Sequence, residues 1–219
     1  MFGRERKVEM VAPEQALPGR DVPVRVAATS IVNGRSMQGP FPEGMQEVVL
    51  GMGCFWGAER IYWDLPGVWV TSVGYSGGYT PNPTYPEVCT GMTGHAEVVR
   101  VVFDPAEVSL EDVLAPFWEQ HDPTTPMRQG NDVGTQYRSA IYVTDDEQLA
   151  VAEASRARYQ ARLDEAGHGR ITTEIALAGP YWFAEDEHQQ YLAKNPGGYC
   201  NHGFCQVAYD RQQPTGTVA

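Results

Sequence analysis

The pattern of hydrophobic and polar positions becomes regular only after about residue 44. Residues 1–44 show no sustained period and are interrupted by many prolines and glycines, which favour turns and irregular backbone. We expect this N-terminal extension to wrap around a domain or to be partly disordered, with one short strand at most, over residues 22–31. The regular pattern predicts one folded domain over residues 45–199, and residues 200–219 form a tail.

Within the domain, strands and helices are both predicted. Segments rich in β-branched and aromatic residues predict strands over 47–51, 68–75, 96–103, 139–143 and 172–177. Helical spacing of apolar residues, with Ser, Thr, Asp and Glu start signals, predicts helices over 58–65, 109–118, 144–165 and 185–192. The proline-rich segment 81–85 and the polar segment 123–134 are predicted loops.

The order of these elements indicates the fold class. Strands and helices are mixed without a regular βαβ repetition, and no internal repeat is visible. This arrangement favours an α+β fold in which helices cover a mixed or antiparallel sheet.

Composition narrows the classes of partner and compartment. The formal net charge of −12 disfavours binding to nucleic acid or to anionic membrane surfaces. No stretch is long and apolar enough to span a bilayer, and no apolar run follows the charged N-terminus. We therefore expect a cytoplasmic protein. In a reducing compartment its four cysteines are catalytic, metal-binding or buried, and seldom structural disulfides.

Cys54 is the first candidate for chemistry. It lies between a predicted strand and a predicted helix, where free backbone N–H groups and the helix dipole stabilise a thiolate. This position predicts a pKa below the free value of about 8.5. Gly53 and Gly57 keep the sulfur accessible, and Phe55 and Trp56 would form an apolar wall beside it. The alternative is that Cys54 is a small buried hydrophobic residue.

The tail supplies a second pair of thiols, Cys200 and Cys205. A mobile thiol can condense with a sulfenic acid formed elsewhere, and a second thiol can pass the resulting disulfide to an external reductant. The competing interpretation is a metal site, because Cys200, His202 and Cys205 are possible zinc ligands. Their spacing does not match a zinc finger, and no second Cys-x-x-Cys pair completes four ligands.

Other polar residues are candidates with ordinary alternatives. Glu97 at a strand entrance is a possible general acid, although a solvated glutamate at a turn is the more common situation. Tyr85 and Tyr137 are possible hydroxyl donors or simply packed aromatics, and Asp132 lies in the polar loop. Cys89 is expected to be a buried, non-catalytic thiol. For His188 and Glu187 we expect a surface or supporting position.

Taken together, these segments resemble the A-type peptide methionine sulfoxide reductases. The resemblance runs from about residue 47 to residue 199 and covers several motifs in the family's order. They are Gly53-Cys54-Phe55-Trp56-Gly57, Gly77-Gly78-Tyr79 to Tyr85, Gly94-His95-Ala96-Glu97, Phe117-Trp118 to Asp122-Pro123, Gln129 to Arg138, and His188-Gln189-Gln190-Tyr191-Leu192.

The resemblance implies a role for each candidate residue. Cys54 would be the nucleophile and Glu97 the proton donor. Tyr85 and Tyr137 would bind the sulfoxide oxygen. Phe55 and Trp56 would hold the S-methyl group, and Asp132 would shape the pocket. Cys200 would resolve the sulfenic acid, with Cys205 as second recycling cysteine.

The resemblance also implies properties of the whole protein. The fold would be a two-layer α+β sandwich with a ferredoxin-like core, and the catalytic domain would span residues 45–199. The enzyme would act on the S epimer of free or protein-bound methionine sulfoxide, with thioredoxin as reductant and no bound cofactor or metal. We expect a monomer. Only four residues separate Cys200 from Cys205, a tighter loop than is usual in three-cysteine members. The resemblance assigns no function to residues 1–44.

Two other classes of protein remain open on the residues alone. One is a thiol peroxidase that uses the same sulfenic acid chemistry, which a comparison of peroxide with methionine sulfoxide would separate. The other is a non-enzymatic, metal-bound interaction domain built on the tail cysteines, which metal analysis of the reduced protein would detect.

Overall fold

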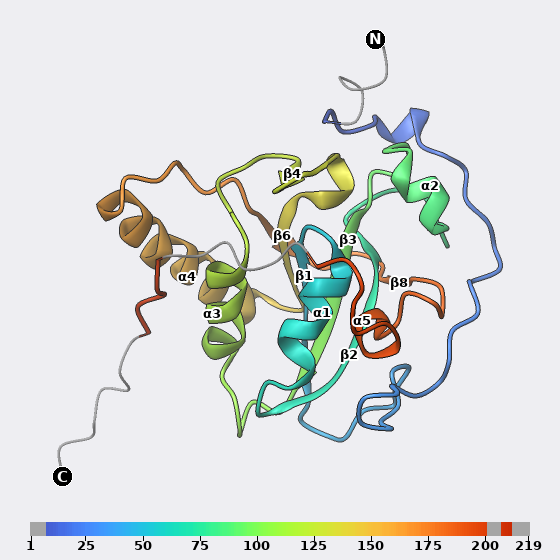
Figure 1. Cartoon of the computed structure of the whole chain (residues 1–219), viewed down its shortest axis with the longest axis horizontal. Coiled ribbons are helices and arrows are strands. Elements are labelled where there is room, and N and C mark those ends of the chain that lie inside the picture. Colours follow the sequence, from blue (N-terminus) through green and yellow to red (C-terminus); the bar gives the residue numbers. More distant parts are fainter. Residues whose placement is uncertain (1–7, 201–206, 212–219) are drawn as a thin grey trace.

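A six-stranded sheet forms the centre of the computed structural model, which describes residues 8–200 and 207–211. The strand order is β7-β6-β1-β3-β2-β8 (Figure 1). Its strands are β1 (Gln46–Met52), β2 (Val68–Ser76), β3 (Ala96–Phe103), β6 (Ser139–Val143), β7 (Glu174–Leu177) and β8 (Trp182–Phe183). All neighbouring strands pair antiparallel except β6 and β7, which are parallel.

Five α-helices and four short elements complete the described fold. The α-helices are α1 (Phe55–Trp63), α2 (Tyr85–Cys89), α3 (Leu110–Gln120), α4 (Asp146–Glu165) and α5 (Tyr191–Lys194). The hairpin strands β4 (Arg128–Gln129) and β5 (Asp132–Val133) lead into the 3₁₀ helix η3 (Thr135–Tyr137), and η2 (Pro13–Gln15) lies in the N-terminal segment. The chain order β1-α1-β2-β3-α3-β6, with central strand order β6-β1-β3-β2, is the ferredoxin-like arrangement. The α+β prediction is therefore confirmed.

Alternation along the strands divides the interior into two layers. Val48 and Leu50 of β1 face a core shared with α1, α3 and α4, whereas Val49 faces the opposite side of the sheet. That opposite side is covered by the N-terminal segment, through Met37 and its neighbours, and by the chain around Tyr181. Residues outside the regular helices and strands thus cover one face of the sheet. The N-terminal segment, blue in Figure 1, runs from α2 to the far end of the molecule.

The strand predicted over residues 22–31 does not form. Among residues 8–44 the only β pairing described is an isolated bridge between Thr29 and Ser36. Backbone N–H groups in this segment bind side chains instead: that of Ala27 donates to Asp186 at 2.9 Å and that of Ile31 to Gln190 at 3.4 Å. These side-chain acceptors replace a strand partner.

The predicted helix over 185–192 is also wrong. Residues 186–190 form turns, and α5 begins only at Tyr191 because Gln190 adopts a left-handed conformation with φ of 47°. The buried side chain of Gln189 binds both backbone groups of Val73 at 2.8 and 2.9 Å, and Gln190 binds Glu59. These contacts to the sheet and to α1 favour a turn over continuous helix.

Smaller differences concern helix starts and loops. Tyr85 is not a loop residue but the first residue of α2, since Thr84 and Glu87 form a capping box. The N-cap of α4 is Asp145 rather than Thr144, because the Asp145 carboxylate accepts the N–H of Gln148. The polar loop 123–134 contains the β4–β5 hairpin.

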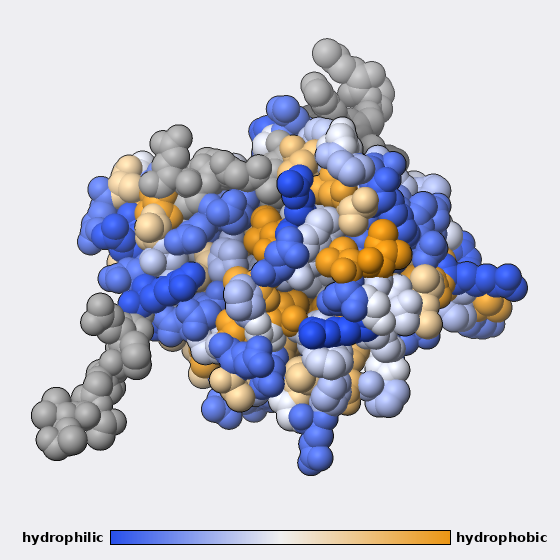
Figure 2. Space-filling model, turned by 60° about the horizontal axis from the view of Figure 1, so that its bottom comes forward, coloured by the Kyte–Doolittle hydropathy of each residue, from blue (hydrophilic) through white to orange (hydrophobic). Residues whose placement is uncertain are grey.

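The described surface is polar with scattered apolar side chains. Figure 2 shows one face on which polar side chains surround small apolar patches. No helix in residues 8–200 and 207–211 is long and apolar enough to cross a membrane. The exposed large hydrophobic residues are Val8, Met10, Val22, Ile31, Tyr79, Met92, Val133, Leu177 and Tyr199.

Candidate active site

Cys54 lies at the junction of β1 and α1, as N-cap of the helix. Gly53 before it has a φ of 86°, and a Cβ at this position would come within 2.4 Å of the Gln129 side chain. Only glycine permits this turn against the β4–β5 hairpin. The hairpin, which carries Asp132, therefore packs directly on the Cys54 turn.

The environment of Cys54 raises rather than lowers its thiol pKa, which corrects the prediction from sequence. The side chain is only 6% exposed, and burial is the largest cause. The negative charge of Glu97 adds to it, and that of Asp132 adds less. Backbone N–H groups of Trp56 and Gly57 do lower the pKa, as expected at a helix N-terminus, but burial outweighs them. Cys54 is a neutral thiol in this state.

Glu97 is buried beside Cys54 and is not a solvated turn residue. It is 1% exposed and shares its face of β3 with Val99 and Val101 of the helix-side core. Its Oε2 accepts the Phe55 backbone N–H at 3.2 Å, and its buried Oε1 has no hydrogen-bond partner among the described residues. Burial raises the pKa of Glu97 to about 8, so the carboxyl is mostly protonated at pH 7.

Two tyrosines face this carboxyl from different elements. Tyr85 is fixed through its backbone N–H, which donates to Glu185 at 2.7 Å, and Tyr137 ends η3. Burial raises the pKa of both hydroxyls, and the charge of Glu97 is the second cause for each. Both hydroxyls are therefore neutral donors near Glu97.

Aromatic rings form a wall beside Cys54. Phe55 is buried, with its ring centroid 5.4 Å from that of His188 and 6.4 Å from that of Tyr85. The Trp56 indole stacks on Tyr191 at 3.9 Å and donates to His188 Nδ1 at 3.2 Å. Because Nδ1 accepts, the imidazole is neutral, and burial lowers its pKa accordingly.

The residue just before the tail, Tyr199, contacts the same site. Its hydroxyl donates to the two Asp132 carboxylate oxygens at 3.3 Å each. Burial, the charge of Asp132 and, more weakly, Cys54 and Cys200 raise its pKa, so Tyr199 lies near both thiols. Cys200 is a free, exposed cysteine. Cys205 and His202, which enter the recycling and metal-binding interpretations, lie outside the described residues.

His188 takes the supporting position expected of it, since it is buried and orients Trp56. Sequence reasoning missed two other contributors to the site. Glu185 fixes Tyr85 through the Tyr85 backbone N–H. Cys89 is only half-buried, and its side chain hydrogen-bonds with that of Tyr85. Tyr85 and Cys89 are four residues apart and so lie on the same face of a helix. This signal went unused because the segment that ends at Tyr85 was predicted to be a loop.

Comparison with known proteins identifies the family. The family model described as peptide methionine sulfoxide reductase matches residues 46–215. The chain belongs to this family. It is 64% identical over 205 residues to the peptide methionine sulfoxide reductase MsrA of Salinispora arenicola, covering 93% of each chain. It is 61% identical over 198 residues to that of Pseudomonas aeruginosa, covering 90% of this chain and 92% of the relative.

Solved structures of family members have the same fold. Methionine sulfoxide reductase A of Corynebacterium diphtheriae aligns with a TM-score of 0.80 at 46% identity, covering 91% of this chain and 97% of its own. Reduced Mxr1 of Saccharomyces cerevisiae aligns with a TM-score of 0.65 at 34% identity, covering 78% and 95%. The chain is thus an oxidoreductase that reduces methionine sulfoxide. The buried Cys54 thiol and Glu97 carboxyl and the half-buried Tyr85 and Tyr137 lie together in its fold.

Proposed function

We propose that Cys54 is the nucleophile that attacks the sulfur of the S epimer of methionine sulfoxide, free or in peptides. The observation that carries this proposal is the pair of Cys54 and Glu97, both buried, joined through the Phe55 N–H. A sulfoxide oxygen leaves poorly until it is protonated. The partnerless Oε1 of the neutral Glu97 carboxyl is suited to supply that proton.

The proton balance supports the same pair of residues. In the reductase step, Cys54–SH and the sulfoxide give the thioether and Cys54–SOH, so no proton is gained or lost overall. Glu97 gives its proton to the sulfoxide oxygen and takes up the thiol proton of Cys54. The thiolate forms only as substrate reacts, stabilised by the Trp56 and Gly57 N–H groups.

The remaining residues bind and orient the substrate. Neutral Tyr85 and Tyr137 hydroxyls donate to the sulfoxide oxygen as negative charge develops on it, as oxyanion-hole donors do. The rings of Phe55 and Trp56 receive the S-methyl group. Asp132, held by the Tyr199 hydroxyl, shapes the rim of the pocket toward the tail.

Recycling uses the tail cysteines and an external dithiol. Cys200 condenses with Cys54–SOH, which releases water and forms the Cys54–Cys200 disulfide. Cys205 then attacks Cys200, and thioredoxin reduces the resulting Cys200–Cys205 disulfide. The exposure of Cys200 and the contact of neighbouring Tyr199 with Asp132 support the first exchange. This chemistry needs no metal or bound cofactor.

We also propose a role for each part of the chain. Residues 45–199 would form the catalytic domain, with residues 1–44 as an extension and 200–219 as a recycling tail. The protein would work as a cytoplasmic monomer that repairs oxidised proteins. Its net charge of −12 supports protein or small-molecule substrates over nucleic acid.

The test is a methionine-release assay with separate sulfoxide epimers and dithiothreitol. The S epimer should be reduced and the R epimer should not, and Cys54→Ser should release no methionine. Reduction by Cys54→Ser, or equal use of the two epimers, would refute the proposal. A parallel assay with peroxide as substrate distinguishes the reductase from a thiol peroxidase. Metal analysis of the reduced protein tests the alternative of a metal site formed by Cys200, His202 and Cys205.

A further inference from the structure

The N-terminal segment contacts the start of α2 through Arg20. Its Nη2 donates to Glu87 Oε1 at 2.7 Å, and its Nη1 donates to the Asn82 carbonyl at 3.0 Å. The other Glu87 oxygen closes the capping box by accepting the Thr84 N–H at 2.8 Å. Although burial alone would raise the pKa of Glu87, the hydrogen bonds from Thr84 and Arg20 lower it. Arg20 therefore binds Glu87, the member of the capping box that lies inside the helix.

The loop before α2 is held by the same segment. The Asn82 side-chain amide donates to the Arg20 carbonyl at 2.7 Å, and the Arg20 N–H donates to the Pro81 carbonyl at 3.1 Å. The Thr80 hydroxyl donates to the Leu17 carbonyl at 2.8 Å. Each segment both donates to and accepts from the other, although the two lie about 60 residues apart in sequence. These hydrogen bonds therefore fix the loop before α2 relative to the N-terminal segment.

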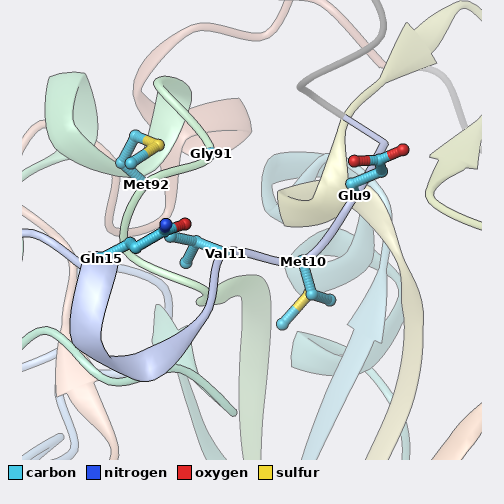
Figure 3. A pocket seen from close by; sticks show the side chains of 6 residues that line it. All are labelled: Glu9, Met10, Val11, Gln15, Gly91 and Met92. Atoms are coloured by element: carbon cyan, nitrogen blue, oxygen red, sulfur yellow. The ribbon is translucent and has the colours of Figure 1, made fainter.

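The end of α2 meets the segment a second time. The Leu17 N–H donates to the Met92 carbonyl at 2.9 Å, three residues after the helix ends. Figure 3 shows Met10, Val11 and Gln15 across a pocket from Gly91 and Met92. The segment therefore contacts the chain on both sides of α2.

The helix between these contacts needs outside support. It has only five residues, and a helix of that length is marginal without tertiary contacts. Tyr85 is its first residue, where helices fray most easily. Any movement of this turn would move the Tyr85 hydroxyl relative to Glu97 and Cys54.

We propose that residues 9–20, here called the N-terminal brace, position the Tyr85 hydroxyl for the sulfoxide oxygen by holding both ends of α2. The inference rests on the proposed role of Tyr85 in binding that oxygen. It gives part of the extension, to which no motif assigns a function, a place in the reductase step. Arg20 is a positioning residue in this arrangement, because it acts through α2.

The test measures single-turnover methionine release against sulfoxide concentration, with dithiothreitol. Arg20→Ala should lower the limiting rate by about threefold to tenfold, the range that corresponds to the loss of one ordinary hydrogen bond, while half-saturation shifts less than twofold. Arg20→Lys, which keeps a charge opposite Glu87, should restore part of the rate. Arg25→Ala, at an exposed arginine of the same extension, is the matched control and should match the unmodified enzyme.

A double-mutant cycle separates positioning from general damage. In the Tyr85→Phe background, Arg20→Ala should cause no further loss. An equal loss in both backgrounds, or a normal rate for Arg20→Ala, would overturn the brace. A normal rate for Tyr85→Phe alone would instead refute the proposed role of Tyr85, and the inference with it. Glu87→Gln repeats the test from the other side of the ion pair, and thermal unfolding of each variant checks folding.

Discussion

The backbone N–H of Phe55 donates to Glu97 Oε2 at 3.2 Å, which ties the carboxyl of β3 to the turn that carries Cys54. The bond occupies one carboxyl oxygen and leaves Oε1 buried without a partner among the described residues. A neutral acid is thereby held next to a neutral thiol. Both groups keep their protons until substrate arrives, since burial raises the pKa of each.

Replacing the acid should slow the chemical step strongly. Glu97→Gln keeps the size of the side chain and an acceptor for Phe55 but has no proton to give. We expect a decrease of about 10²–10⁴ in single-turnover methionine release at pH 7. Glu107→Gln, at an exposed carboxyl shortly after the same strand, is the matched control. A near-normal rate for Glu97→Gln would rule out its role as proton donor.

The rate should depend on pH through the same group. Burial raises the pKa of Glu97 to about 8, so the reactive form holds its proton below that pH. Single-turnover release should be constant between pH 6 and pH 7 and fall as pH rises through about 8. In Glu97→Gln this decline should vanish from the residual rate. If the rate of the variant still fell at the same pH, the decline would belong to the titration of another group.

Stability should also depend on pH through the buried carboxyl. The pKa of Glu97 rises from 4.5 to about 8 on burial, so between these values the folded state holds a proton that the unfolded state has lost. The stabilising contribution is therefore complete below 4.5 and declines as pH rises to about 8, by at most about 1.4 kcal/mol per pH unit.

Chemical denaturation at pH 5 and pH 8 measures this effect. From pH 5 to pH 8 the free energy of unfolding should decrease more for the unmodified protein than for Glu97→Gln. Glu59 has a pKa that burial raises to about 7, so Glu59→Gln provides an independent comparison with a similar sign. An identical pH-dependent loss in Glu97→Gln and the unmodified protein would show that Glu97 titrates alike in the folded and unfolded chain.

Trp56 should control substrate binding through its fixed ring. Stacking on Tyr191 and the hydrogen bond to His188 hold the indole in place. Trp56→Ala would remove the proposed apolar contact with the S-methyl group, which should lower kcat/KM by roughly tenfold to 100-fold. Trp63→Phe, at the other end of α1, should leave the kinetic constants unchanged. Steady-state assays with a blocked methionine sulfoxide would contradict this role if Trp56→Ala behaved like the control.

Much of the fold and of the site could be predicted from the sequence, because local signals agreed with the final packing. The strands 96–103 and 139–143 match β3 and β6 residue for residue, since both segments are rich in β-branched and other apolar residues. The alternation of side chains along β3 also predicts that Glu97 is buried, because it lies two residues before Val99 and therefore faces the same core. The general preference of glutamate for the surface favoured the opposite prediction.

What the sequence could not supply are effects of distant contacts. The pKa of Cys54 depends on how deeply the site is buried and on Glu97, 43 positions away, and these outweigh the helix N-terminus. The turn at residues 186–190 depends on Gln189 and Gln190 reaching β2 and α1. Local propensity favours a helix there, and tertiary hydrogen bonds override it.

In the proposed reaction the sulfoxide oxygen passes to the sulfur of Cys54. One turnover of Cys200→Ser with S-epimer sulfoxide, followed by a sulfenic acid trap and peptide mass spectrometry, tests this transfer. We expect about one methionine released per enzyme, the trapped oxygen adduct on the Cys54 peptide, and no sustained turnover with thioredoxin. An adduct on Cys89 instead, or release of methionine with Cys54 unmodified, would contradict it.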